Sequence, residues 1–414
     1  MQNKLIGNAI VGQSGGPTAA INATLAGVIK GALECDAIKT LYGMRNGIEG
    51  MLGERMIDLS KRFEGGKDID ALIHTPAAAL GSCRKKLPNP DSEKAEDIAF
   101  FEKVFEIFRK YDIRYFFYIG GNDSMDTVAK LSRYAEKKDY EIRVMGVPKT
   151  IDNDLVATDH TPGFGSAAKF VAVTMKELIR DISVYSMKAV TIVEVMGRDA
   201  GWLTTASALP VISGGRAPDL IYLPERPFDP DKFIESINEL QKDHPALLVA
   251  VSEGIKFPDG RYVGEGLGGR KVDAFGHVAL SGAGKVLEEL VKEKVGCKVR
   301  SIELNLPQRC AAHIASGADI AESVGVGRAA VGFAVEGRTG VMATIDRAEG
   351  EGYSVSFGAS NIAEIANAVK TVPDEYINDT ADGITEAGIN YLKPLIMGEC
   401  EIVYDNGMPA HIVL

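Results

Sequence analysis

The stretch YFFYIGGNDS, residues 115–124, is the part of the chain that most strongly determines the expected fold. Residues 115–119 form an apolar run typical of a buried strand, and a glycine pair with polar residues follows directly. A second apolar run, residues 144–147, leads in the same way into PKTIDND at residues 148–154. Because open α/β sheets bind ligands at the carboxyl ends of their strands, we expect both polar segments at one binding site.

The same alternation of apolar run, loop and helical pattern continues on both sides of these segments. Further examples are residues 8–18, 189–198 and 247–254, each of which changes from an apolar run to a glycine or acidic loop. This pattern is typical of a doubly wound α/β fold. Neither a low-complexity linker nor a fixed-period repeat divides the sequence, so we expect two domains between which the chain crosses more than once.

Composition limits the classes of function. A chain of 414 residues with 45% hydrophobic content can bury a large core, and its net charge of −11 argues against binding to nucleic acid or an anionic membrane. The five cysteines form no Cys-x-x-Cys pair, which indicates reduced thiols in a cytosolic protein. No apolar stretch approaches the roughly 20 residues of a membrane span, so we expect a cytoplasmic protein.

The loop GQSGGPT, residues 12–18, precedes a helical pattern over residues 19–30. A glycine pair lets main-chain N–H groups approach an anion, and a helix N-terminus favours negative charge, so phosphate is a natural ligand. The alternative is a turn that needs glycine only for its backbone angles. In TIDND, residues 150–154, a carboxylate is available to accept the proton of an attacking hydroxyl, although Asn and Asp are also common turn residues.

These segments, together with TDHTPGFGSAA at residues 158–168, resemble the phosphofructokinase family in the form that uses inorganic pyrophosphate instead of ATP. The resemblance implies two doubly wound Rossmann-like domains with the active site in the cleft between them. The expected domain that binds the donor and Mg²⁺ comprises about residues 1–165 plus 308–370. The expected sugar-phosphate domain comprises about residues 166–307 plus 371–414.

The resemblance also indicates the phosphoryl donor. ATP-using relatives have glycine at the position of Asp123, and a carboxylate about 4 Å from a phosphate oxygen would cost roughly 4 kcal/mol at an effective dielectric of 20. Lys149 also stands where ATP-using members commonly have glycine, and it supplies a compact cation for pyrophosphate. Alternatively, Asp123 is only the N-cap of a helix that begins near Ser124, which leaves Lys149 unexplained.

Roles for the remaining residues follow from the same resemblance. Asp152 is the expected base, Thr150 binds the transferring phosphoryl group, and Arg198 stabilises the transferred charge; Asp123 and Lys149 complete the catalytic set. Donor-binding positions are Gly15, Gly16, Gly121 and Arg84. Substrate-binding positions are Thr150, Asp152, Met196, Gly197, Arg198, Glu253, Arg300 and Arg309. Because one of the last two arginines reaches in from a neighbouring subunit in this family, a homodimer or homotetramer is expected.

Three positions depart from the family pattern. Asn122 stands where an aspartate usually binds magnesium, so Mg²⁺ is expected at Asn122 and Asp123 but held mainly by Asp123, the donor and water. Leu306 replaces a histidine or tyrosine, and the basic residue expected nine before Arg198 falls on Ala189. A longer acceptor such as sedoheptulose 7-phosphate therefore stays open.

The resemblance thus implies a cytoplasmic, Mg²⁺-dependent enzyme of glycolysis. It would transfer a phosphoryl group reversibly from pyrophosphate to the 1-hydroxyl of fructose 6-phosphate. The alternatives are an ATP-dependent phosphofructokinase and a non-catalytic sugar-phosphate sensor on the same fold. The base at Asp152 argues against a sensor, which has no use for it.

Overall fold

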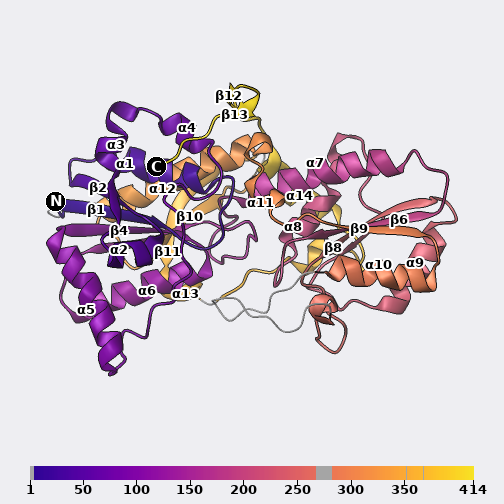
Figure 1. The fold of residues 1–414 in the computed structure, drawn as a ribbon, viewed down its shortest axis with the longest axis horizontal. Helices are drawn as coiled ribbons and strands as arrows, with labels where there is room; N and C mark the ends of the chain where they lie inside the picture. Colours follow the sequence, from indigo (N-terminus) through magenta and orange to yellow (C-terminus); the bar gives the residue numbers. More distant parts are fainter. Residues whose placement is uncertain (1–3, 267–281, 351, 367) are drawn as a thin grey trace.

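A computed structural model describes residues 4–266, 282–350, 352–366 and 368–414. Two β-sheets with helices packed on them form the two ends of the molecule, with the smaller sheet on the right in Figure 1. The expected α/β class with two doubly wound, Rossmann-like units is confirmed. No helix in the described ranges is both long enough and apolar enough to cross a membrane.

The first sheet has seven strands within the described residues. In spatial order they are β11 (Val355–Asn361), β10 (Val341–Arg347), β5 (Arg143–Pro148), β4 (Ile113–Gly120), β1 (Gly7–Gln13), β2 (Ile38–Met44) and β3 (Met56–Asp58). The inner pairs are parallel, whereas β11 and β3 join the two edges antiparallel. The helices that accompany this sheet are α1 (Ile21–Leu33), α2 (Gly47–Leu52), α3 (Leu59–Arg62), α4 (Ile69–Ile73), α5 (Ala95–Lys110), α6 (Asn122–Lys137), α12 (Gly317–Val335) and α13 (Ile362–Ile365).

The second sheet has four parallel strands in the described part of the chain. In spatial order they are β7 (Leu220–Tyr222), β8 (Ala246–Ser252), β6 (Ala189–Val195) and β9 (Lys298–Glu303). Its helices are α7 (Phe164–Ile182), α8 (Trp202–Thr205), α9 (Pro230–Leu240), α10 (Ala283–Lys294), α11 (Pro307–Cys310) and α14 (Glu386–Leu392), and a short hairpin of β12 (Tyr404–Asp405) and β13 (Met408–Pro409) lies near the C-terminus. The division into a donor domain and a sugar-phosphate domain stays a proposal.

Strand β4 shows why the first sheet is buried on both faces. Side chains alternate along a strand, so Tyr115, Phe117 and Ile119 enter the core shared with α1 and α12. Phe116 and Tyr118 enter the opposite core, under α5 and α6. A strand covered on both faces is expected to be a nearly continuous apolar run, and residues 115–119 are one.

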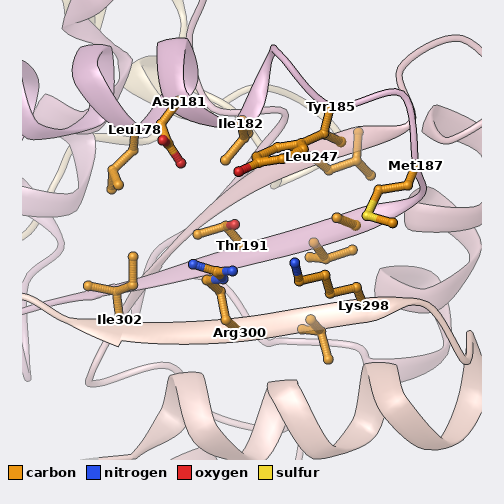
Figure 2. Close-up of a pocket in the computed structure, with 14 residues that line it drawn as sticks. Leu178, Asp181, Ile182, Tyr185, Met187, Thr191, Leu247, Lys298, Arg300 and Ile302 are labelled. Carbon is orange, nitrogen blue, oxygen red and sulfur yellow. The ribbon is translucent and has the colours of Figure 1, made fainter.

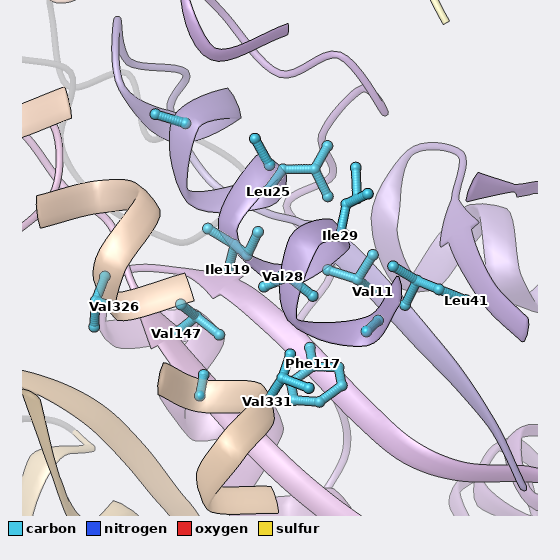
Figure 3. Close-up of a cluster of buried hydrophobic side chains, with 14 of the residues drawn as sticks. Val11, Leu25, Val28, Ile29, Leu41, Phe117, Ile119, Val147, Val326 and Val331 are labelled. Carbon is cyan, nitrogen blue, oxygen red and sulfur yellow. The ribbon is translucent and has the colours of Figure 1, made fainter. Parts of the chain in front are cut away.

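Helices α1 and α12 pack closely over the first sheet, and Figure 3 shows Leu25 and Val28 of α1 in one buried cluster with Val326 and Val331 of α12. Glycines permit this approach: a Cβ added at Gly27 would lie 2.1 Å from the carbonyl oxygen of Val324. The end of the chain returns to the same region, where the Ile412 N–H donates to the Thr75 hydroxyl at 3.0 Å.

Candidate active site

Neighbouring strand ends of the first sheet bring the predicted loops together. β1 and β4 pair Gln13 with Ile119, and β4 and β5 pair Gly120 with Pro148, so the loops that follow these strands leave from one edge of the sheet. Loops after β6 and β8 face them from the second sheet. Together they line an open cavity of about 440 Å³, which we call the central cavity. Its lining residues are Ser14, Gly15, Gly16, Arg84, Lys86, Gly121, Asn122, Asp123, Ser124, Lys149, Thr150, Asp152, Asp154, Arg198, Asp199, Ala200, Glu253 and Val369.

The first loop is shaped around Lys149. Gly15 has a φ of 78°, which only glycine adopts readily, and a Cβ there would lie 3.3 Å from Lys149 Nζ. Lys149 Nζ donates to the Gly16 carbonyl at 2.8 Å. A Cβ at Gly16 would lie 3.3 Å from a guanidinium nitrogen of Arg309, so this arginine also reaches the loop.

Lys149 is only 4% exposed. Burial lowers the pKa of its ammonium to about 8, while the carboxylates of Asp152 and Asp154 act in the opposite direction. A cation at the floor of a cavity, close to a glycine loop, is well placed to receive an anionic phosphate.

Thr150 and Asp152 form a compact pair on the loop after β5. The Thr150 hydroxyl lies 3.5 Å from Asp152 Oδ2 and accepts the Asp152 N–H at 3.1 Å. Burial raises the pKa of Asp152, and the charges of Lys149 and Arg198 oppose that rise. A carboxylate with a raised pKa beside two cations is suited to accept a proton from a bound hydroxyl.

Asn122 and Asp123 begin α6, and both line the central cavity. Gly121 is the N-cap of this helix and the Asp123 side chain makes no capping hydrogen bond, so the alternative that Asp123 is only an N-cap is wrong. Asp123 instead pairs with Lys86, with 3.5 Å between carboxylate and ammonium.

The oxygens here fit a hard divalent cation. Asn122 Nδ2 donates to Asp154 Oδ2 at 3.1 Å, which turns Asn122 Oδ1 away from that contact; this oxygen is buried and has no hydrogen-bond partner among the described residues. Burial, with repulsion from Asp152, raises the pKa of Asp154 to about 7. The described residues contain no cluster of three or more His, Cys, Asp or Glu that could hold a metal, so a cation here would take further ligands from a bound phosphate and water.

The second sheet supplies the remaining groups. Glu253 Oε1 accepts the Gly197 N–H at 3.3 Å, and burial raises the pKa of Glu253 to about 7. The Met196 N–H donates to Gln308 Oε1 at 3.2 Å, and both residues line a smaller adjoining cavity with Glu253. Arg198 faces the central cavity, and its buried Nε has no hydrogen-bond partner in the described part of the chain.

Arg300 lies apart from these residues. It is on β9 and lines a different, much smaller cavity of about 50 Å³, where Figure 2 shows it beside Lys298 and below Tyr185. Tyr185 and Met187 are more than half exposed. Within one chain, therefore, the structure brings together all the other predicted site residues but not Arg300.

The sequence did not single out several residues of the central cavity. Four of them lie within two positions of a predicted site residue, and this proximity in sequence could have indicated them: Ser14, Lys86, Asp199 and Ala200. Val369 comes from a segment more than 100 residues away along the chain, and no local motif marks it.

Comparison with known proteins gives consistent matches. The family model described as phosphofructokinase matches residues 8–333. A relative from Methylococcus capsulatus, named pyrophosphate–fructose 6-phosphate 1-phosphotransferase, is 42% identical over 412 residues, 98% of this chain and 96% of the relative. A protein of the same name from Halomonas elongata is 40% identical, over 97% of this chain and 94% of its own. The crystal structure of a pyrophosphate-dependent phosphofructokinase from Nitrosospira multiformis has a TM-score of 0.87 at 38% identity, covering 98% of this chain and 96% of that one.

Proposed function

This chain belongs to the phosphofructokinase family, and on that premise we propose that it is the pyrophosphate-dependent enzyme. It transfers a phosphoryl group reversibly from pyrophosphate to the 1-hydroxyl of fructose 6-phosphate. The products are fructose 1,6-bisphosphate and phosphate. The reaction is a step of glycolysis.

The single observation that best supports pyrophosphate as donor is the buried ammonium of Lys149 against the Gly16 carbonyl. Lys149 lines the central cavity together with Asn122 and Asp123. A small, highly charged donor gains from a compact cation at this place. The larger nucleotide would have to place its inner phosphate near a carboxylate.

The transfer is proposed to be direct. The 1-hydroxyl oxygen attacks the terminal phosphorus, the bridging P–O bond breaks, and phosphate leaves with the bond's electrons. Asp152 accepts the hydroxyl proton, and the Thr150 hydroxyl, 3.5 Å from that carboxylate, binds the transferring group. Arg198 and Arg84, which both line the central cavity, stabilise charge on the phosphoryl oxygens.

Magnesium is the proposed cation. The Asn122 carbonyl oxygen and the Asp123 carboxylate would hold it, which accounts for the unpartnered Asn122 oxygen. When bound, Mg²⁺ neutralises part of the negative charge on the donor oxygens. Gly15, Gly16 and Gly121 then present main-chain groups to the donor.

The acceptor is proposed to lie toward the second sheet. Glu253, with Met196 and Gly197 beside it, binds sugar hydroxyls, and Arg309 binds the 6-phosphate. Arg300 lines a different cavity and not the central one, so we propose that it serves the site of a second copy in a homodimer or homotetramer. A cytoplasmic location fits these metabolites.

The experiment that tests this function measures fructose 1,6-bisphosphate formed from fructose 6-phosphate and Mg²⁺, with pyrophosphate or ATP at matched concentrations. We expect turnover with pyrophosphate and little with ATP. The double variant Asp123→Gly with Lys149→Gly should lose most of the activity with pyrophosphate. Turnover with ATP alone would contradict the donor assignment, and no turnover with either would contradict the function.

A further inference from the structure

A segment near the C-terminus, residues 368–372, forms part of the wall of the central cavity. Val369 lines this cavity beside the donor residues, and Lys370 follows it with a partly buried side chain. Neither residue has a role in the mechanism proposed above. Their position nevertheless places them between the loop that carries Asp152 and the loop that carries Arg198.

Lys370 contacts both ends of the loop that follows the proposed base. Its ammonium donates to Asn153 Oδ1 at 3.4 Å at one end, and to the carbonyls of Thr158 at 3.1 Å and Asp159 at 2.6 Å at the other. Its main-chain N–H donates to the Asp154 carbonyl at 2.8 Å. One residue therefore supplies four hydrogen bonds to a loop of seven residues, 153–159.

The anchored loop has two non-glycine residues in the left-handed backbone region, Asn153 with a φ of 53° and Ala157 with a φ of 63°. Asparagine adopts this region more readily than other residues, whereas alanine does so rarely, so contacts must hold the loop in this shape. The Lys370 ammonium is one of the groups in contact with the Asn153 side chain. At the far end, Asp159 is also fixed, because its carbonyl accepts the Tyr391 hydroxyl at 2.7 Å and its carboxylate pairs with Arg347 at 3.1 Å.

The same segment is tied to the other side of the central cavity. The Lys370 carbonyl accepts the indole N–H of Trp202 at 2.9 Å. Glu225 Oε1 accepts two main-chain N–H groups, from Gly201 and from Val372, each at 2.9 Å. Residues 370–372 thus form hydrogen bonds both with the loop that carries Asp152 and with Trp202, shortly after Arg198.

We propose that Lys370 is a positioning residue for phosphoryl transfer, which holds the Asp152 loop in place relative to the Arg198 loop. The proposal rests on the function proposed above. Lys370 acts through Asn153 and the loop carbonyls and does not touch the reacting atoms. Burial lowers the pKa of its ammonium to about 8, and the carboxylates of Asp159 and Asp154 support the charged form.

The test compares Lys370→Met with Lys370→Arg and with Lys393→Met, a control at an exposed lysine of the same C-terminal region. Because misplacement of a catalytic group by about 1 Å can cost about 100-fold, we expect kcat to fall 10- to 100-fold in Lys370→Met. KM for both substrates should change less than about threefold, since the binding groups remain. Lys370→Arg should recover part of kcat because it keeps a charged donor, and Lys393→Met should match the wild type.

A second measurement separates positioning from general damage and does not depend on activity. Amide hydrogen exchange over residues 151–163 should be faster in Lys370→Met than in the wild type, whereas exchange over residues 21–33 of α1 should be unchanged. Unchanged kcat in Lys370→Met, or unchanged exchange over residues 151–163, would overturn the proposal. An inactive wild type would instead refute the proposed function, and the exchange measurement would still test the contacts. Should Lys370→Met not fold, the same two measurements on Lys370→Arg decide, with a smaller loss expected.

Discussion

Glu253 illustrates how burial at a single residue makes stability depend on pH. Burial raises the pKa of its carboxyl to about 7, whereas an unfolded glutamate titrates near 4.3. Between these values the folded protein binds more protons than the unfolded chain, so the free energy of unfolding falls as pH rises toward and through 7. The stabilisation that comes from the protonated Glu253 carboxyl is fully present only below the pKa that this group has in the unfolded chain.

A neutral substitute should remove this dependence. The quantity compared is the free energy of unfolding of Glu253→Gln minus that of the wild type, both without ligand. We expect this difference to be more positive at pH 8 than at pH 4.5, by on the order of 1–3 kcal/mol. Urea unfolding at the two pH values measures the difference, with Glu235→Gln, on the exposed face of α9, as control. Equal differences at both pH values would show that the pKa of Glu253 is not raised.

At the scale of elements, the close contact between α1 and α12 depends on the absence of a side chain at Gly27. A methyl group at Gly27 would lie 2.1 Å from a main-chain oxygen of α12, so the helices would have to separate. We expect Gly27→Ala to lower the free energy of unfolding by about 1–3 kcal/mol in urea titrations.

Gly332 is the matched control within α12, because no atom lies within 4 Å of an added Cβ there. Gly332→Ala should leave stability unchanged or raise it by up to about 1 kcal/mol, since alanine favours the helical backbone. A loss of similar size in both variants would mean that the close packing is not the cause.

Individual elements also show what could be predicted from the sequence. The central strands β4 and β6 were predictable because sheets covered on both faces require long apolar runs. The edge strand β3 was not, since its three residues, Met56–Asp58, carry too little pattern to distinguish them from a loop. The alternative that α6 begins near Ser124 with Asp123 as its N-cap was wrong by two residues, because Gly121 is the N-cap and the helix begins at Asn122.

The candidate site was predictable where it follows strand ends, since neighbouring parallel strands place their loops at one edge. Lys149, Asp152 and Asp123 meet for that reason. Lys370 was not predictable, because its contact with Asn153 spans 217 positions and depends on the path of the chain through both sheets. Local patterns carry no information about such a contact.

At the scale of the whole molecule, the position of Arg300 makes assembly testable. If this arginine serves a second copy, Arg300→Ala should raise KM for fructose 6-phosphate at least tenfold and leave KM for pyrophosphate nearly unchanged. Asp152→Asn should lower kcat by about 100-fold or more, because the base is lost.

Mixing the two variants tests the exchange of residues between copies. Hybrid oligomers formed after dissociation and reassembly would contain some sites with both an intact Asp152 and an intact Arg300. Activity well above that of either variant is therefore expected, measured at low fructose 6-phosphate. Activity equal to the average of the two parents would show that each chain uses its own Arg300.

The indole of Trp202 makes the contact between residues 370–372 and the Arg198 loop observable by fluorescence. It is the only tryptophan in the sequence, and the Lys370 ammonium lies 5.4 Å from its ring centre. A charge so close to an indole shifts its emission. The ring is buried, and its N–H donates to the carbonyl of Lys370, the residue that contacts the Asp152 loop. We therefore expect the intrinsic fluorescence of the protein to change when a ligand shifts these loops, which a ligand titration would measure.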